Sequence, residues 1–230
     1  MRLPVALMHL MLLGAVACAG GCASFPQHQV PTVTTMPYMG TPGQRPNAHM
    51  DVQFFAGEPG NQPTLLTAGQ PGMGDLLQLV HKTVDESGLF QQVSYDSTAS
   101  KPASGDLHLS LRIYDHCSAT EAMISSVITG LSLGLVPGGN TDSYTLQLEV
   151  TDNRGQTLAS VSNEDATRTY IGLVFLPFQG HDLQASVNSV LSNQIRSALK
   201  EAYDAGKLVA VNTPTRSSDN GDILSVAGVK

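Results

Sequence analysis

Apolar residues recur at helical spacing in two segments of the chain, residues 75–88 and residues 182–206. The apolar stripe of the first segment consists of Leu76, Leu77, Val80 and Val84. The stripe of the second segment consists of Leu183, Val187, Leu191, Ile195, Ala198 and Ala202. Each segment begins with an aspartate, which can cap a helix, and ends at a glycine, which can adopt the left-handed conformation that stops one. The pattern therefore predicts two amphipathic helices, each with one face in a core.

Alternation of apolar and polar residues predicts strands over residues 106–117 and 142–151. The residues of one strand face are Leu107, Leu109, Leu111 and Ile113 in the first, and Tyr144, Leu146, Leu148 and Val150 in the second. A turn at residues 152–155 leads into a further strand, which is the pattern of an antiparallel hairpin. Shorter strands are predicted within residues 49–57 and 91–96.

The predicted order of elements is therefore β-α-β-β-β-β-α. Strands with a single apolar face need helices on that face only. The pattern predicts a two-layer α+β sandwich over residues 49–206, with an antiparallel sheet of about four to five strands and two helices on one face. A third helix joins them if residues 122–136 are helical. Residues 207–230 lose the periodicity, and we expect a loose tail there.

The N-terminus has the pattern of a secretory leader over residues 1–21, with Arg2, an apolar run over residues 3–17 and small residues after it. This run of about 15 residues is shorter than the ~20 that a membrane-spanning helix needs. A cysteine directly after small residues resembles the lipobox of bacterial lipoproteins. In that family the leader is cut before the cysteine, which then carries the lipid.

Three alternatives are open for the start of the mature chain. Cys22, which precedes a Pro/Gln-rich stretch, is the favoured lipidated residue, and Cys18 is the alternative. Cleavage after residues 15–17 would instead give a soluble periplasmic protein. The family usually has Leu three residues before its cysteine, and this chain has Ala before both. Ser24 lies where lipoproteins of the outer membrane commonly avoid Asp, so the resemblance implies a lipid anchor in that membrane and a domain facing the periplasm.

Residues 22–48 contain five prolines among Gln, Thr and Gly. Such a composition favours an extended, weakly ordered chain that cannot build a core. We therefore expect a tether between the membrane and the domain.

The stretch "ESGLFQQVSYD" (residues 86–96), together with strands flanked by two helices, resembles a known group of proteins. These are small Gram-negative outer-membrane lipoproteins whose periplasmic domain is similar to the N-terminal domain of the Tol-Pal propeller protein. The penicillin-binding-protein activator lipoproteins and the curli-secretion lipoprotein share this plan. The resemblance covers about residues 50–204 and implies a binding or assembly role in the cell envelope rather than catalysis. It assigns no functional residue.

Residues 122–141 contain no charged side chain, and a second apolar run covers residues 170–178. Ordinary connections are short and polar, so these runs need an explanation. Three readings are open: a third buried helix over residues 122–136, an exposed surface that binds a protein or a second copy, or contact with the membrane. We base the functional prediction on the second reading, in which residues 123–137 and 171–178 form the binding surface. Its candidate residues are Ile124, Val127, Leu131, Leu133, Leu135, Leu173, Phe175 and Phe178.

The charged residues argue against several other functions. The formal net charge is −7, and the basic residues are scattered, whereas a nucleic-acid-binding protein needs them clustered. His108 and His116 share a strand face but lie about 26 Å apart at ~3.3 Å per residue, so we predict no metal site and no cofactor. No Gly-x-Ser-x-Gly or phosphate-binding motif occurs, and we predict that the chain is not an enzyme.

Two alternative functions are kept. One is a regulator that docks on a peptidoglycan synthase through the polar sheet face, near His108, Arg112 and Gln147. The other is an envelope enzyme whose site assembles from residues without a local signature.

Overall fold

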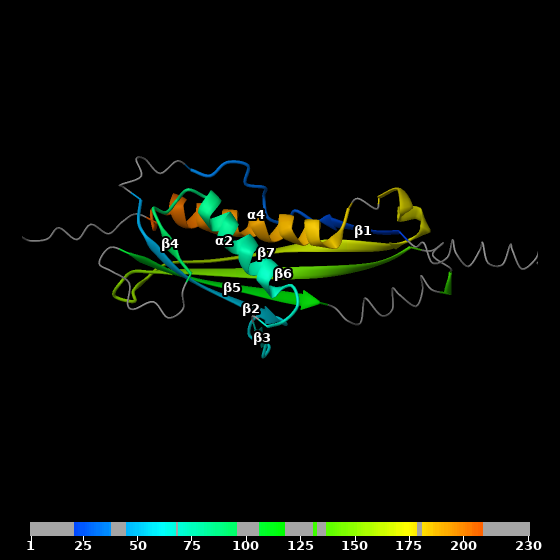
Figure 1. The fold of residues 1–230 in the computed structure, drawn as a ribbon, viewed down its shortest axis with the longest axis horizontal. Coiled ribbons are helices and arrows are strands. Elements are labelled where there is room, and N and C mark those ends of the chain that lie inside the picture. The colour runs from blue at the N-terminus through cyan, green and yellow to red at the C-terminus, as the bar shows by residue number, and fades with distance from the viewer. Residues whose placement is uncertain are drawn as a thin grey trace, which may run out of the picture.

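The computed structural model describes residues 21–37, 45–67, 69–95, 106–117, 131–132, 137–178 and 181–208. The elements are β1 (Gly21–Pro26), β2 (Ala48–Ala56), β3 (Thr64–Leu66), α2 (Met73–Glu86), β4 (Val93–Ser94), β5 (Leu107–Cys117), β6 (Gly138–Thr151), β7 (Thr157–Gly172), η2 (Leu173–Phe178) and α4 (Leu183–Asp204). Helices α2 and α4 cover the same face of one sheet (Figure 1). The fold is α+β, as the sequence predicts.

The sheet differs from the prediction in size and in strand direction. Across the described residues it has seven strands in the order β1-β7-β6-β5-β2-β3, with β4 pairing to β2. β2 runs parallel to β5 and to β4, and the other pairs are antiparallel. The prediction of a purely antiparallel sheet of four to five strands was wrong. The reason is α2, which lies between β2 and β5 in the chain and returns it to the same end of the sheet, so that the next strand is parallel.

The core lies between the sheet and the two helices. The alternating leucines of β5 and β6 are fully buried against α2 and α4. The buried side chains on the two helices include Val80, Val84, Leu191, Ile195 and Leu199. Most of each predicted apolar stripe therefore faces the core, but Leu183, the first residue of the second stripe, is exposed at the start of α4.

Helix ends follow the prediction in part. Asp182 caps α4, because its Oδ1 accepts a hydrogen bond from the Ala185 amide at 2.6 Å. α2 begins earlier than expected, at Met73, with Gly72 as its N-cap and no side-chain cap. Asp75 lies within the first turn, where its charge favours the helix dipole. Gly88 and Gly206 follow the two helices with positive φ, as predicted.

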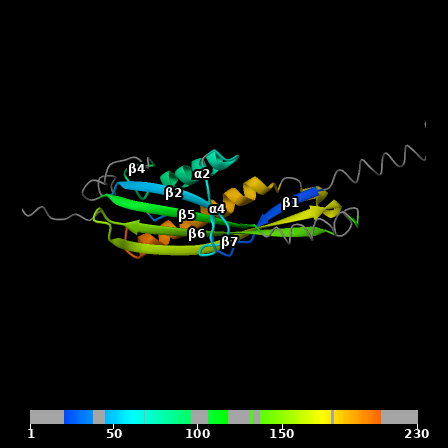
Figure 2. The same ribbon diagram turned by 90° about the horizontal axis from the view of Figure 1, so that it is seen from below.

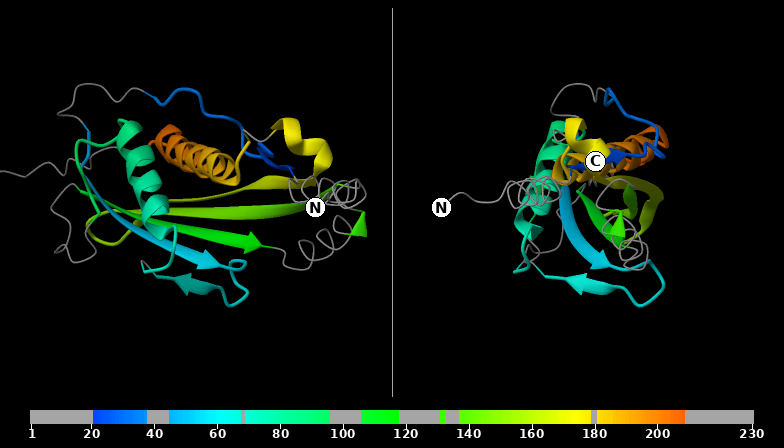
Figure 3. Two further views of the ribbon diagram at one scale, coloured as in Figure 1. Left: turned by 45° about the vertical axis from the view of Figure 1, so that its right-hand side comes forward. Right: turned by 90° about the vertical axis from the view of Figure 1, so that its right-hand side faces the viewer.

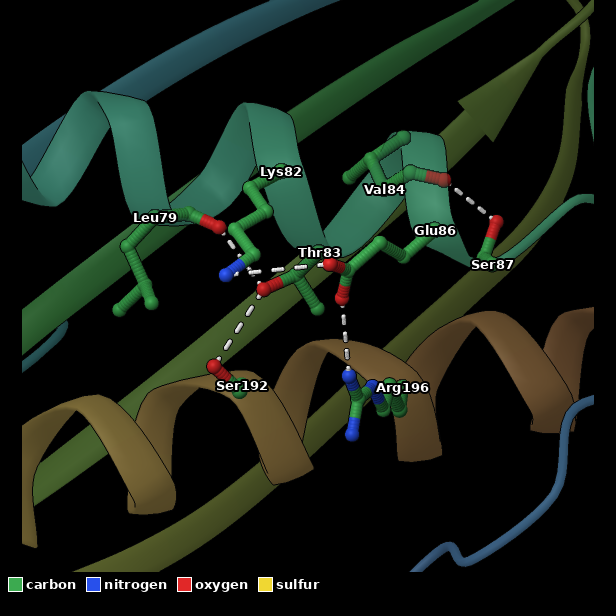
Figure 4. A network of polar contacts seen from close by, with 8 residues as sticks. All are labelled: Leu79, Lys82, Thr83, Val84, Glu86, Ser87, Ser192 and Arg196. Atoms are coloured by element: carbon green, nitrogen blue, oxygen red, sulfur yellow. Dashed lines mark hydrogen bonds and ion pairs between the residues drawn. The ribbon is translucent and has the colours of Figure 1, made fainter.

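The two helices also contact each other through polar side chains (Figure 4). The hydroxyls of Thr83 and Ser192 lie 3.3 Å apart, and Arg196 pairs with Glu86 at 3.3 Å. The ion pair is solvent-exposed and therefore adds little stability. The apolar stripes beneath these contacts are the main source of packing energy.

The sheet narrows toward one end, which we call the tip. β5 ends opposite Asp142, whereas β6 and β7 continue beyond it. β1 pairs with this extension along Thr167–Gly172 of β7. The tip is defined as residues 21–26, 138–142 and 167–172 together with η2, and Figure 2 shows β1 lying along it at one end of the molecule.

The structure contradicts the predicted tether over residues 22–37. Residues 21–26 form β1, and Ala23, Ser24 and Val30 are buried. The following segment lies against α4 and β7, where the amide of Val33 donates to Asn193 Oδ1 at 2.8 Å and the amide of Gln29 donates to Asp165 Oδ1 at 3.0 Å. A segment without periodic apolar residues can still hold a defined position when polar side chains form hydrogen bonds with its backbone amides and carbonyls. The domain therefore begins well before residue 49.

At the other end of the chain, Leu208 is fully buried, so packing continues past the predicted boundary at Gly206. Of the leader predicted over residues 1–21, residues 1–20 lie outside the described residues, as do residues 209–230 of the tail predicted over residues 207–230.

Asn193 offers a test of whether residues 27–37 belong to the domain. Its side chain accepts from the Val33 amide and donates to the Val30 carbonyl at 3.1 Å. Asn193→Ala leaves both groups without a partner and should lower the free energy of unfolding by about 1–3 kcal/mol in chemical denaturation. Asn188→Ala is the matched control, because Asn188 pairs only with exposed Gln184 among its described contacts and should change stability by less than about 0.5 kcal/mol. Equal effects of the two substitutions would support the tether.

Candidate functional site

The tip brings Cys22 next to the end of β7. Cys22 is exposed, and its Cα lies opposite that of Ile171 in the antiparallel ladder. Such partners are about 4.5–5.5 Å apart. The predicted lipidation site is therefore a position within the sheet itself rather than at the far end of a tether.

Exposed apolar side chains surround this position. The exposed fractions are 38% for Ile171, 55% for Val174 and 46% for Phe178. Leu131, in the short described segment 131–132, is 84% exposed. The green strands β5 and β6 run toward this end of the molecule in Figure 3. Apolar side chains left in water carry a cost that burial removes, so this end is the strongest candidate for a contact surface.

Aromatic rings link β1 to the chain around η2. The ring centroids of Phe25 lie 4.8 Å from His181, 6.1 Å from Tyr170 and 6.4 Å from Phe178. Phe175 stacks on Tyr170 at 5.0 Å. These distances are those of favourable aromatic pairs, so η2 is held on β1 and β7 in a fixed position.

A cation lies on this cluster. The guanidinium carbon of Arg168 is 5.4 Å from the centroid of Tyr170, within the range of a cation–π contact, and its Nη1 donates to Thr141 Oγ1 at 3.2 Å. Arg168 is exposed, so its charge remains available to solvent or to an anionic surface.

Three of the predicted binding residues, Leu173, Phe175 and Phe178, lie together in η2. Leu131 and Phe178 are exposed, and Leu173 and Phe175 are half-buried in η2. Ile124, Val127, Leu133, Leu135 and the alternative anchor Cys18 lie outside the described residues. Ile171, Val174 and Phe25 were missed as individual residues. The first two lie in the apolar run that the sequence marks, whereas Phe25 lies in the segment that its composition assigns to a tether.

Asp115 lies near the end of β5, where the sheet begins to narrow. Burial, and next the negative charge of Asp142, raise the pKa of the Asp115 carboxyl above its usual range, and His116 opposes this shift. The buried Oδ1 of Asp115 has no hydrogen-bond partner among the residues described. The folded state therefore disfavours the ionised form of this side chain.

The helix-free face of the sheet is polar. A cavity of about 190 Å³ on it is lined by Ser110, Arg112, Gln147, Leu148, Glu149, Ser160, Val161 and Ser162. The parallel pairing of β2 with β5 places His49 beside His108, with ring centroids 5.4 Å apart. A metal ion needs further ligands, and in the described parts of the chain no group of three His, Cys, Asp or Glu side chains could hold one.

A larger cavity of about 470 Å³ lies between residues 33–37 and the two helices. Its charged lining consists of Arg45, Glu86 and Arg196, and the last two form the ion pair already described. The cavity is open and its cations have partners, so it offers no anion site.

Helices of the described residues include none that is both long and apolar enough to cross a membrane.

Comparison with known proteins gives only distant similarities. No protein-family model and no curated protein matches the chain. A minor lipoprotein from Acinetobacter baumannii aligns at 10% identity and a TM-score of 0.36, over 70% of this chain and 93% of the other. PelC from Paraburkholderia phytofirmans, crystallised as a dodecamer, aligns at 12% identity and a TM-score of 0.30, over 79% and 98%. A neuraminyllactose-binding hemagglutinin homolog from Helicobacter pylori aligns at 11% identity and a TM-score of 0.32, over 78% and 92%.

Similarities of this size establish no family for the chain. They do not show the expected resemblance to the Tol-Pal propeller protein or to the penicillin-binding-protein activators. The functional argument therefore rests on the residues of the chain itself.

Asp115 generates a prediction about stability and pH. Because the pKa of Asp115 is raised in the folded state, ionisation at neutral pH destabilises the fold relative to the unfolded chain. Asp115→Asn should therefore raise the thermal unfolding midpoint at pH 7. The gain should shrink as the pH falls through the folded-state pKa, and it should vanish below the ordinary Asp value of about 3.9. Glu164→Gln removes the same charge from an exposed position of β7 and should show no such gain. A gain for Asp115→Asn that does not depend on pH would contradict this account.

Proposed function

We propose that this chain is a lipid-anchored binding component of the bacterial cell envelope, attached to the outer membrane through Cys22 and facing the periplasm. It acts by association through its apolar tip and performs no catalysis. The observation that carries the proposal is the position of Cys22, which is exposed at the same tip as Ile171, Val174 and Phe178. The leader pattern before Cys22 supports the anchor.

The placement of titratable side chains favours binding over catalysis. Tyr95 is half-buried, and its hydroxyl donates to Asp85 Oδ1 at 2.8 Å and to the His81 carbonyl at 3.2 Å. The His81 ring stacks on Tyr95 at 3.7 Å, and burial lowers the pKa of this histidine. This cluster joins α2 to the chain after β4, whereas Asp115 lies on β5. Groups that share a reaction must converge on one substrate, and these groups belong to separate parts of the fold.

Lipid attachment can be tested on the full-length protein in a Gram-negative host. Cys22→Ser should abolish incorporation of labelled palmitate and leave the precursor uncleaved, because the thiol is the attachment point. Cys18→Ser is the matched control and should incorporate lipid as the wild type does. Mass spectrometry of the mature N-terminus reads out both variants. Loss of lipid in Cys18→Ser alone would move the anchor to Cys18, and lipid in neither wild type nor variants would refute the anchor.

A second candidate function is docking of a peptidoglycan synthase on the polar sheet face. The observation that favours it is the cavity lined by Ser110, Arg112 and Gln147 on the face that neither α2 nor α4 covers. Arg112 is exposed there and can present a charged hydrogen-bond donor to a partner.

Charge reversal tests this second candidate. Arg112→Glu should raise the dissociation constant for a purified peptidoglycan synthase by about tenfold or more, equal to about 1.4 kcal/mol or more. Arg154→Glu makes the same change at the exposed turn after β6 and should leave the constant unaltered. Circular dichroism confirms that both variants fold. An unchanged constant for Arg112→Glu, or no binding by the wild type, would exclude docking through this face.

A further inference from the structure

We infer that the apolar tip lies in the phospholipid surface to which Cys22 is attached. This inference rests on the proposed lipid anchor and names the partner of the same tip. The sequence alone favours a protein or a second copy at the apolar residues. The place of Cys22 in the sheet reverses that preference.

The first step is the absence of any spacer between Cys22 and the folded sheet. Ser24, two residues after Cys22, is fixed by three hydrogen bonds. Its amide donates to the His181 carbonyl at 2.8 Å, its hydroxyl pairs with Thr169 Oγ1 at 2.8 Å, and its carbonyl accepts from Ser186 Oγ at 2.7 Å. Two strand residues span only about 7 Å. Lipid on Cys22 therefore holds the tip within one or two side-chain lengths of the membrane surface.

The second step is the distribution of apolar exposure. The large apolar side chains exposed in the described residues are Leu65, Leu131, Ile171, Val174, Phe178 and Leu183. Leu183 begins α4, directly after the His181 carbonyl that pairs with β1, so it also lies near the tip. Leu65 lies apart from these residues, on β3, and Leu131 belongs to the separate described segment 131–132. Apolar exposure is thus concentrated beside the anchor.

The third step is the size of this surface. Among the described residues of the tip, Ile171, Val174 and Phe178 together present on the order of 200–350 Å², taking roughly 150–250 Å² for a fully exposed large side chain. A stable protein interface buries about 800 Å² on each partner. An apolar patch of this kind instead suits the headgroup and acyl boundary, which accepts apolar side chains to a depth of about 5–10 Å. Phospholipid already occupies that position if Cys22 carries a lipid.

The fourth step is the chemistry of the tip. Aromatic side chains such as Tyr170, with a polar group and an apolar ring, are favoured at membrane surfaces. Arg168 lies over Tyr170 and can contact lipid phosphate. The Asp182 carboxylate, also close to the tip, is engaged as the cap of α4. Asp142, a further carboxylate of the tip, is half-buried and accepts from Asn140 Nδ2 at 2.8 Å. The described tip therefore presents apolar groups and the Arg168 cation, and both nearby carboxylates are engaged in hydrogen bonds.

The chain contains no tryptophan, so a single introduced tryptophan reports its own surroundings. Phe178→Trp places the probe at the tip, and Leu65→Trp, at 53% exposure on β3, is the matched control. Each full-length lipidated protein is reconstituted into phosphatidylethanolamine–phosphatidylglycerol vesicles that contain phospholipid with brominated acyl chains. Emission from position 178 should shift to shorter wavelength and lose most of its intensity to bromine. Emission from position 65 should keep the wavelength and intensity that it has in the same vesicles without brominated phospholipid.

Several outcomes would overturn the inference. A probe at position 178 that is as unquenched as the one at 65, on protein whose Cys22 is shown to be lipidated, contradicts it while leaving the proposed anchor intact. A blue-shifted but unquenched probe would place the tip against a protein or a second copy. Lipid absent from Cys22 contradicts the proposed function and this inference together. Should Phe178→Trp fail to fold, Val174→Trp carries the same test.

Photo-crosslinking from position 174 in cells distinguishes phospholipid from a protein or a second copy at the tip. A product with phospholipid supports the inference, and a discrete band with itself or with another protein contradicts it.

Discussion

The antiparallel pairing of β1 with the end of β7 determines the position of the proposed anchor relative to the rest of the molecule. After cleavage of the proposed leader, five residues of β1, from Cys22 to Pro26, align with residues 167–171 of β7. A backbone ladder resists separation because each buried amide and carbonyl that loses its partner costs free energy. The proposed lipid-bearing residue is therefore part of the sheet. It cannot move away from the domain without breaking strand pairing.

The inner face of the sheet changes from apolar at the wide end to polar toward the tip, and this change explains how β1 is held. Toward the wide end, the leucines of β5 and β6 pack on the helices. Toward the tip, the inner side chains of β7 are Asp165, Thr167 and Thr169, all buried under the first half of α4 and the segment after β1. Apolar packing at this place would tolerate small shifts of β1 along β7. A hydrogen bond such as that from Ser186 Oγ to the Ser24 carbonyl forms only within a narrow range of distances and angles. The polar layer thus fixes the register of residues 21–37.

The elements that pack through apolar side chains could be predicted from the sequence, whereas the element held by buried polar side chains could not. β5, β6 and α4 were predicted because an apolar period of 2 or 3.6 is recognisable in each of them, even though α4 also buries Ser186, Asn193 and Gln194. β1 was missed because its buried residues are Ala23 and Ser24, which carry little hydrophobic signal, and because Pro26 and the prolines that follow β1 indicate a tether. Its existence depends on β7, almost 150 residues later, and no local pattern contains that pairing.

Strand direction was missed for a related reason. Residues 48–56 read as a strand, but direction is set by α2, which carries the chain back across the sheet before β5. The neighbours His49 and His108 follow from that parallel register and were not foreseen. For the tip, the apolar run over residues 170–178 was visible in the sequence. Its location beside Cys22 was not, because the location is a property of the β1–β7 pair.

The proposed attachment at Cys22, which has no spacer, would limit where this protein can act. A lipoprotein on a long flexible tether can search a volume far from its membrane, and a chain fixed at residue 22 cannot. β7 has 16 residues, and at about 3.3 Å each it is about 50 Å long, which is close to the full length of the sheet. With the tip at the bilayer, every described surface of the domain lies within about 50 Å of the membrane.

The helix-free polar face of the sheet then extends away from the membrane in a fixed orientation. Any periplasmic partner of that face must itself come within this distance of the membrane, which favours partners that are membrane-bound or that span the periplasm.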